Sequence, residues 1–188
     1  MARPKSGDKR NAILDAATRV IVAQGLSAPT ARIAEEAGIS NGSLFTYFET
    51  KVDLLNQLFL ELKAGMAAAA LKGFPEQSEL RKQVFHVWSN WMDWATSNPE
   101  KRRALAQLSV SEEITPATRL AAHKASAGLV DLMERIRANG SLRTAPMSFA
   151  GALMNSLAET TMDFMINDPA NAKKHCKVGF ETFWRAIS

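Results

Sequence analysis

The sequence predicts an all-α fold of about nine helices. Apolar residues recur at spacings of three and four, as on one face of a helix, and no segment shows the β-branched alternation of a strand. Glycines and prolines mark where successive helices end and begin. The chain has 188 residues, 46% of them hydrophobic, which suits one or two small domains with a buried core.

Each expected helix has its own boundary signals. The first carries an apolar stripe and stops at Gly25, while Gly73 and Asn139-Gly140 end two later helices. Three further helices begin at a proline that follows a capping side chain, in the pairs Asn98-Pro99, Thr115-Pro116 and Asp168-Pro169. The expected helices span residues 8–24, 29–36, 40–47, 50–72, 76–97, 99–109, 115–139, 146–166 and 169–187.

The charge is mildly basic and concentrated at the N-terminus. The formal net charge is +4 and the sequence pI is about 9.4. Arg3, Lys5, Lys9 and Arg10 stand against Asp8 alone in the first ten residues. Such an arm is suited to phosphate groups, although a solvated chain end has the same composition.

Composition argues against secretion and against a membrane span. The single cysteine, Cys176, cannot form an internal disulfide. No apolar segment follows the basic N-terminus, as a signal peptide would require, and no uninterrupted run approaches the roughly 18 apolar residues of a transmembrane helix. We therefore expect a cytoplasmic protein without membrane contact.

Residues 29–51 hold the strongest pattern, two short helices joined by a turn at Gly38. Glycine supplies the positive φ that such a turn needs, and Ser40 is placed to cap the second helix. The residues expected to face inward, or to fill the gap between the helices, are Ile33, Ala34, Ala37 and Ile39.

The second of these helices has two chemically different faces. Leu44 and Phe48 lie four apart and share a buried face. The opposite face carries short or planar hydrogen-bonding groups, suited to base edges and phosphates. A helix-turn-helix places such a helix in the major groove of DNA. The outward residues are Asn41, Ser43, Thr46 and Tyr47.

This segment resembles the TetR family of one-component regulators. The match is the pattern I-A-x-x-A-G-I-S-x-G-S-L-F-x-Y-F-x-x-K from Ile33 to Lys51, about a tenth of the chain; the remainder agrees in length and helix count. The resemblance implies an N-terminal three-helix DNA-binding domain, residues 1–50, and a helical regulatory and dimerisation domain, residues 51–188. It implies DNA contacts by Thr30, Ser40, Asn41, Gly42, Ser43, Thr46, Tyr47 and Lys51.

Two positions depart from the family pattern. Many relatives have Lys at the position of Asn41, whose amide could pair instead with adenine. Many have Tyr at the position of Phe45, so one hydroxyl that would contact phosphate is missing.

The remaining helices hold more apolar surface than a DNA-binding domain needs. Paired domains set the spacing of DNA half-sites, so we expect a homodimer. The resemblance places a four-helix interface on the last two helices, although some of their residues belong to the core of one chain. The interface candidates are Leu153, Leu157, Phe164, Phe180, Phe183 and Trp184.

An apolar pocket is the second expected feature. Aromatic and Met side chains suit a cavity that accepts varied ligands, with His86 and Asn90 as polar groups, although each side chain could equally be core. The candidate ligand-binding residues are Met66, Trp88, Trp91, Met92, Leu108, Met133, Asn155 and Glu159.

These features together predict a repressor of transcription that binds a palindromic operator and is released by a small, largely apolar effector. Effector binding would rotate the long helix that begins near Thr50 and change the separation of the two recognition helices. Activation of transcription is possible with the same fold.

Two other classes of function are considered. An enzyme is disfavoured because His86, His123 and His175 are scattered, and no phosphate loop or nucleophile motif occurs. We expect no metal and no cofactor. A helical adaptor that binds protein in an aromatic groove is the other alternative, and loss of DNA binding at raised salt would distinguish the two.

Overall fold

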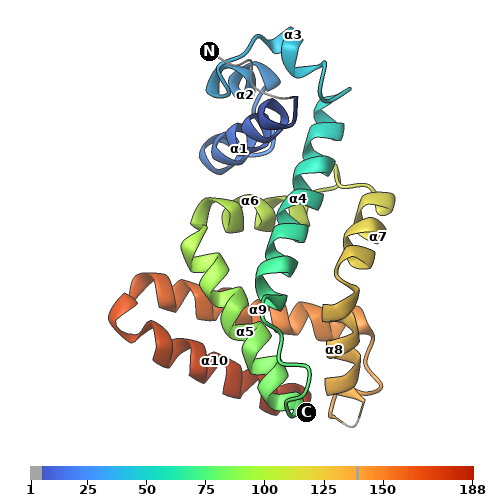
Figure 1. Ribbon diagram of the computed structural model, residues 1–188, viewed down its shortest axis with the longest axis vertical. Helices are drawn as coiled ribbons and strands as arrows, with labels where there is room; N and C mark the ends of the chain where they lie inside the picture. The colour runs from blue at the N-terminus through green and yellow to red at the C-terminus, as the bar shows by residue number, and fades with distance from the viewer. Residues whose placement is uncertain (1–5, 139) are drawn as a thin grey trace. The chain divides into compact units, whose positions relative to one another are not determined.

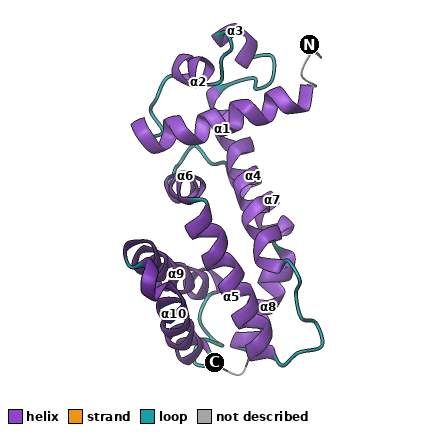
Figure 2. Ribbon diagram, turned by 60° about the vertical axis from the view of Figure 1, so that its left-hand side comes forward, coloured by secondary structure: helices purple, strands orange, loops and turns teal. Residues whose placement is uncertain are grey.

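The structure is a computed structural model that describes residues 6–138 and 140–188. Over these residues it contains ten α-helices, one short 3-10 helix and no strand, and the all-α prediction is confirmed (Figures 1 and 2). The elements are α1 (Ser6–Gln24), α2 (Thr30–Glu36), α3 (Asn41–Leu44), α4 (Lys51–Leu71), α5 (Leu80–Ser97), α6 (Pro99–Ser109), α7 (Pro116–Ala125), α8 (Ala127–Arg137), α9 (Met147–Asn167), η1 (Pro169–Asn171) and α10 (Ala172–Ile187).

The predicted boundaries at Gly25, Gly38, Gly73, Pro99 and Pro116 hold, whereas Pro169 begins the 3-10 helix η1 and α10 starts at Ala172. Gly25, Gly38 and Gly73 have φ of 81°, 67° and 67°, and each follows a helix as expected. The Thr115 hydroxyl accepts a hydrogen bond from the Thr118 amide at 3.1 Å, which caps α7 before Pro116.

The helix predicted over residues 115–139 is divided in two, and the helix predicted over residues 76–97 begins only at Leu80. Residues 115–139 were expected to form a single helix, but Ser126, with φ −103° and ψ 21°, separates α7 from α8. Arg3, Lys5 and Asn139, singled out from the sequence, lie outside the described residues.

The chain forms two compact units that are discontinuous in sequence. The first comprises residues 1–64 and 99–124, and the second comprises residues 65–98 and 125–188. This grouping differs from the functional boundary predicted after residue 50, which remains a prediction.

In the first unit, α1 packs against α2 and α6, and α2 packs against α3. Asn56 of α4, 8% exposed, fastens the segment between α6 and α7 to this unit. Its amide nitrogen donates to the Glu113 carbonyl at 2.8 Å, and its amide oxygen accepts from the Thr115 amide at 3.0 Å. The helix-turn-helix is therefore built into a core to which residues far along the chain contribute.

In the second unit, α9 and α10 lie side by side and both contact α5 (Figure 1). Trp88 of α5 stacks on Phe183 of α10 at 5.4 Å between ring centroids, and its indole N–H donates to the Cys176 carbonyl at 3.1 Å. Leu132, Met133 and Ile136 of α8 belong to the same core.

One described helix, α4, is long and apolar enough by composition to cross a membrane. Lys51, Asp53, Glu61 and Lys63 interrupt its apolar residues, which is why no unbroken run was found in the sequence. Five of its large apolar residues are at most 4% exposed, as in the core helix of a globular protein: Leu54, Leu55, Leu58, Phe59 and Leu62.

Candidate nucleic-acid interface

The turn between α2 and α3 has the predicted geometry. Gly38 takes its positive φ and its amide donates to the Glu35 carbonyl at 3.0 Å, while the Ile39 amide donates to the Ala34 carbonyl at 2.9 Å. Ser40 then caps α3, because its hydroxyl oxygen accepts from the Ser43 amide at 3.1 Å.

The buried face of α3 is also as predicted. Leu44 is fully buried and Phe48 is 1% exposed. On the outer side the structure leaves most of the predicted DNA-contacting residues accessible to solvent. Ser40, Asn41, Gly42, Ser43 and Thr46 are exposed, and Thr30, Tyr47 and Lys51 are half-buried.

The recognition helix is shorter than the 40–47 predicted. Regular α-helix ends at Leu44, and the chain continues in a tighter turn, with the Tyr47 amide donating to the Leu44 carbonyl at 3.0 Å. The Thr46 hydroxyl donates to the Ser43 carbonyl at 2.7 Å. Such side-chain bonds compete with the helical pattern, and β-branched and aromatic residues are weak helix formers.

The first turn of α4 is fixed from both directions. The Asp53 amide donates to the Thr50 hydroxyl at 3.0 Å, and the Asp53 carboxylate accepts from the Glu49 amide at 3.0 Å. Gln57 donates to the same carboxylate at 2.9 Å. These bonds hold Lys51, the predicted phosphate ligand, on an ordered turn.

Arg10, part of the predicted phosphate-binding arm, has a different role in the structure. Its guanidinium donates to the Gln57 side-chain oxygen at 2.8 Å, lies 4.0 Å from the Glu61 carboxylate and stacks 5.8 Å from the centroid of Phe48. These contacts attach α1 to α4. Arg10 thus has a structural role, and phosphate binding by the N-terminal arm stays a prediction.

The eight predicted ligand-binding residues fall in different environments. Trp88, Met92 and Met133 are at most 6% exposed and belong to the packed core of the second unit. Leu108 is fully buried in the first unit. Trp91, Met66 and Glu159 are half-buried and Asn155 is exposed. Their role in ligand binding stays a prediction.

An open groove of about 660 Å³ lies between α5 and α10, within the second unit. His86 and Asn90, the predicted polar groups, are among its lining residues, and both bond to the Lys72 carbonyl, at 2.8 and 3.0 Å. None of the eight predicted ligand-binding residues lines this groove. Among the residues that the structure describes, no three His, Cys, Asp or Glu side chains are grouped to hold a metal ion.

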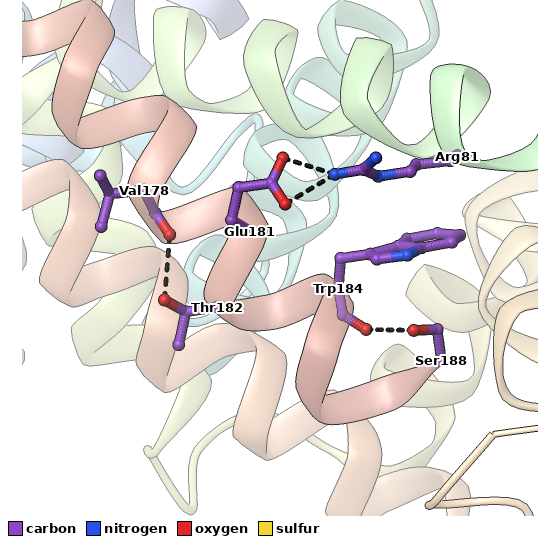
Figure 3. A network of polar contacts seen from close by, with 6 residues as sticks. All are labelled: Arg81, Val178, Glu181, Thr182, Trp184 and Ser188. Atoms are coloured by element: carbon purple, nitrogen blue, oxygen red, sulfur yellow. Dashed lines mark hydrogen bonds and ion pairs between the residues drawn. The ribbon is translucent and has the colours of Figure 1, made fainter.

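Some of the residues predicted to form the dimer interface are buried within one chain, and others are accessible. Phe180 and Phe183 are each 2% exposed within one chain, so they form intrachain core, and their assignment to an interface was wrong. Trp184 is half-buried, packs on Phe180 and lies 6.0 Å beneath the guanidinium of Arg81, which binds the Glu181 carboxylate at 2.6 Å (Figure 3).

Apolar side chains do remain exposed on α9 and α10. Phe164 is 58% exposed, and Leu153 and Leu157 are half-buried. Val178, another apolar residue that the sequence places on the last helix, is 57% exposed, and Phe149, absent from the predicted interface, is 56% exposed. The spacing 149, 153, 157, 164 puts four of these residues on one face of α9. The sequence alone gives this spacing. It does not give which other faces of α9 are buried.

A short helix with outward polar groups, set on a turn with a buried inner face, defines a helix-turn-helix DNA-binding protein. Residues 13–58 match the family model described as "Bacterial regulatory proteins, tetR family". This segment contains α2, α3 and the first turns of α4.

Solved structures agree with that match over nearly the whole chain. A tetR family transcription regulator from Shewanella sp. PV-4 is 28% identical, with a TM-score of 0.85, over 95% of this chain and 97% of that one. Another from Marinobacter aquaeolei VT8 is 22% identical, with a TM-score of 0.85 and 97% coverage of both chains. LfrR from Mycobacterium smegmatis, in complex with proflavine, is 18% identical, with a TM-score of 0.67, over 96% and 97%.

The N-terminal segment thus matches the TetR family, and over nearly its whole length the chain has the fold of solved TetR-family transcription regulators.

Proposed function

We propose that this chain is a homodimeric repressor that binds a palindromic operator in duplex DNA and is released by a small, largely apolar effector in the cytoplasm. The observation that carries the proposal is the surface of α3. Its inner residues, Leu44 and Phe48, are buried, while Asn41, Ser43 and Thr46 are exposed. A DNA-reading helix needs this separation of faces.

The contacts divide by chemistry. Asn41 offers both a donor and an acceptor for the edge of a base, and Ser43, Thr46 and Tyr47 offer hydroxyls for bases or phosphates. Lys51 supplies a positive charge to a phosphate. Thr30, Ser40 and Gly42 complete the backbone contacts with hydroxyls and a backbone amide.

The dimer is proposed from the exposed apolar residues of α9 and α10. Phe149, Phe164 and Val178 are each more than half exposed. A two-fold pair would cover this surface with its own copy and would set two recognition helices about one DNA turn apart. Leu153, Leu157 and Trp184 lie on the same two helices and would contribute at its edge.

The effector is proposed from the aromatic and Met residues of α5 and from one similar protein. LfrR, which shares the fold, was solved with proflavine bound. The residues proposed to contact an effector in this chain remain those predicted from the sequence. Because Lys51 begins the helix that continues to Leu71, a rotation of α4 would carry an effector signal to the DNA contacts.

The proposal is tested by selecting bound sequences from a random duplex pool and measuring affinity for the selected site at two salt concentrations. We expect a palindromic site, a complex with two chains per duplex, and weaker binding at higher salt because phosphate contacts release counterions. A compound screen on the bound complex then searches for release. A purified dimer that ignores duplex DNA at low salt would contradict the proposal.

A further inference from the structure

Phe45 is an exposed aromatic residue on the DNA-binding surface that the predicted set of contacts leaves unused. Its side chain is 41% exposed at the C-terminal end of α3, while the adjacent Leu44 is fully buried. Within residues 6–138 and 140–188, no aromatic ring or basic side chain stacks on it. An accessible ring of this size leaves apolar surface in water unless a partner covers it.

The position of Phe45 on α3 indicates what that partner is. Phe45 directly follows the last residue of α3, and its φ of −72° keeps the right-handed path of the helix up to this side chain, while its ψ of −3° belongs to the tighter turn that follows. It therefore follows Asn41 by four residues and Gly42 by three, and all three share one side of the helix. Asn41 and Gly42 are both exposed.

Gly42 leaves room beside the ring. It has no side chain, and a Cβ built there would meet only the Ser40 hydroxyl, at 4.0 Å. A DNA strand can approach this side of α3 closely, and the apolar ring of Phe45 stands next to the polar amide of Asn41. One surface thus offers a hydrogen-bonding group and an apolar group one turn apart.

We propose that Phe45 reads a thymine by packing against its C5-methyl group in the major groove, next to the base contacted by Asn41. The inference rests on the proposed function, in which α3 enters that groove. Thymine is the one base that presents a methyl group there, and apolar side chains are its matching partners. Without a hydroxyl, the Phe45 ring donates no hydrogen bond to phosphate, so its contribution is apolar contact.

The experiment uses the full chain and its selected operator. Each thymine is replaced in turn by deoxyuridine, which removes the methyl group and leaves base pairing unchanged. We expect the wild-type protein to lose about fourfold in affinity at one thymine of each half-site, the value of one buried methyl-sized group. Phe45→Ala should bind the thymine operator more weakly and no longer distinguish thymine from deoxyuridine there.

Two further variants complete the design. Phe85→Ala removes a ring that is 40% exposed on α5, away from α3 in the sequence, and should keep the full thymine preference. Phe45→Leu keeps an apolar contact and should retain part of it, which tests the idea even if Phe45→Ala does not fold.

Three results would overturn the inference. In the first, the wild-type protein binds equally well after every replacement of thymine by deoxyuridine. In the second, a folded Phe45→Ala variant still prefers the same thymine. In the third, Phe45→Ala loses affinity equally on all sequences, which would indicate a sugar or phosphate contact. In each of these the proposed function survives, because the protein still binds its operator. Absence of any duplex binding would instead defeat both proposals.

Discussion

Thr50 and Asp53 hold the first turn of α4 together, since the Asp53 amide donates to the Thr50 hydroxyl at 3.0 Å. Asp53 in turn accepts from the Glu49 amide through its carboxylate. Lys51 lies between Thr50 and Asp53 in the sequence. The stability of this turn and the position of the predicted phosphate ligand are therefore linked.

Removing the cap should lower stability. We expect Thr50→Ala to reduce the free energy of unfolding by about 1 kcal/mol, because the Asp53 amide loses its partner at the helix start. Thr50→Ser keeps the hydroxyl and should stay close to wild type in a urea titration. Equal losses for the Ala and Ser variants would mean that the methyl group, not the hydrogen bond, matters.

Lys51→Ala should weaken binding to all duplexes by a similar factor. A phosphate contact carries no sequence information, and its removal should reduce the slope of log affinity against log salt by about 1 for each phosphate that is no longer bound. Titrations of specific and unrelated duplexes at several salt concentrations measure this. Lys82→Ala, which removes an exposed lysine of α5, is the control. A weakening confined to the specific site would show that Lys51 reads sequence.

Asn41→Ala should relax specificity at one base position of each half-site. A bidentate amide–adenine pair discriminates by about 1–3 kcal/mol against other bases. Repeating the DNA selection with the variant shows whether that position becomes degenerate. Asn167→Ala, which replaces an exposed asparagine at the end of α9, should leave the selected sequence unchanged. An unaltered preference in Asn41→Ala would remove this residue from the base-reading set.

Gly179 allows α10 to approach α9 closely, and Gly179→Ala should destabilise the fold. A Cβ at Gly179 would lie 2.8 Å from the Thr161 Cγ2 atom and closer still to its hydroxyl. Thr161 is 6% exposed and β-branched, so it has little freedom to move. We expect a loss of about 1–3 kcal/mol in the free energy of unfolding, as for other overpacked cores.

A matched glycine gives the opposite expectation. Gly151 in α9 has no atom within 4 Å of a built Cβ, so Gly151→Ala should gain about 0.5–1 kcal/mol from helix propensity. Thr161→Ala combined with Gly179→Ala should recover part of the loss. Two glycine variants of equal stability would contradict the close packing of α9 and α10.

Cys176 should react slowly with alkylating reagents in the native protein. It is 8% exposed, and burial raises the pKa of its thiol above the ordinary value of 9.0. We expect native alkylation to be slower than in urea by about tenfold or more. Since this is the one cysteine of the chain, mass spectrometry reads the rate directly. Equal rates in both conditions would contradict its burial.

The same shift has a pH consequence. The folded protein binds the thiol proton more tightly than the unfolded chain does, so the free energy of unfolding should fall as the pH rises above about 9. Cys176→Ser titrates no thiol and should lack this component in urea titrations between pH 8 and 10. A decline of identical size in both proteins would assign it to other groups.

Local rules predicted the helix-turn-helix well because it is held by local bonds. Gly38 needs its positive φ and Ser40 caps three residues ahead, and both follow from neighbours in the sequence. The break at Ser126 had no such signal. The nearest glycine, Gly128, lies inside α8 and not at the break. Since α7 and α8 belong largely to different compact units, we infer that tertiary packing set the boundary.

Periodicity also cannot say which partner covers an apolar face. Phe180 and Phe183 share one face of α10 with good helical spacing, which fits a dimer interface and a core equally well. In the structure Trp88 and Phe85 of α5 cover them. Each of these ring pairs joins residues 95 positions apart, beyond the reach of any local pattern.

The packing of α6 against α1 bears on how such regulators can be recombined. The Gln107 amide reaches the Ile21 carbonyl at 3.4 Å, and Ala104 and Leu108 of α6 are fully buried. A chimera that takes only residues 1–50 from this chain would transfer a DNA-binding domain without α6. The surface of α1 that packs against α6 would then lose its partner. To transfer the operator preference of this chain, a chimera would need two gene segments, one encoding residues 1–64 and one encoding residues 99–124.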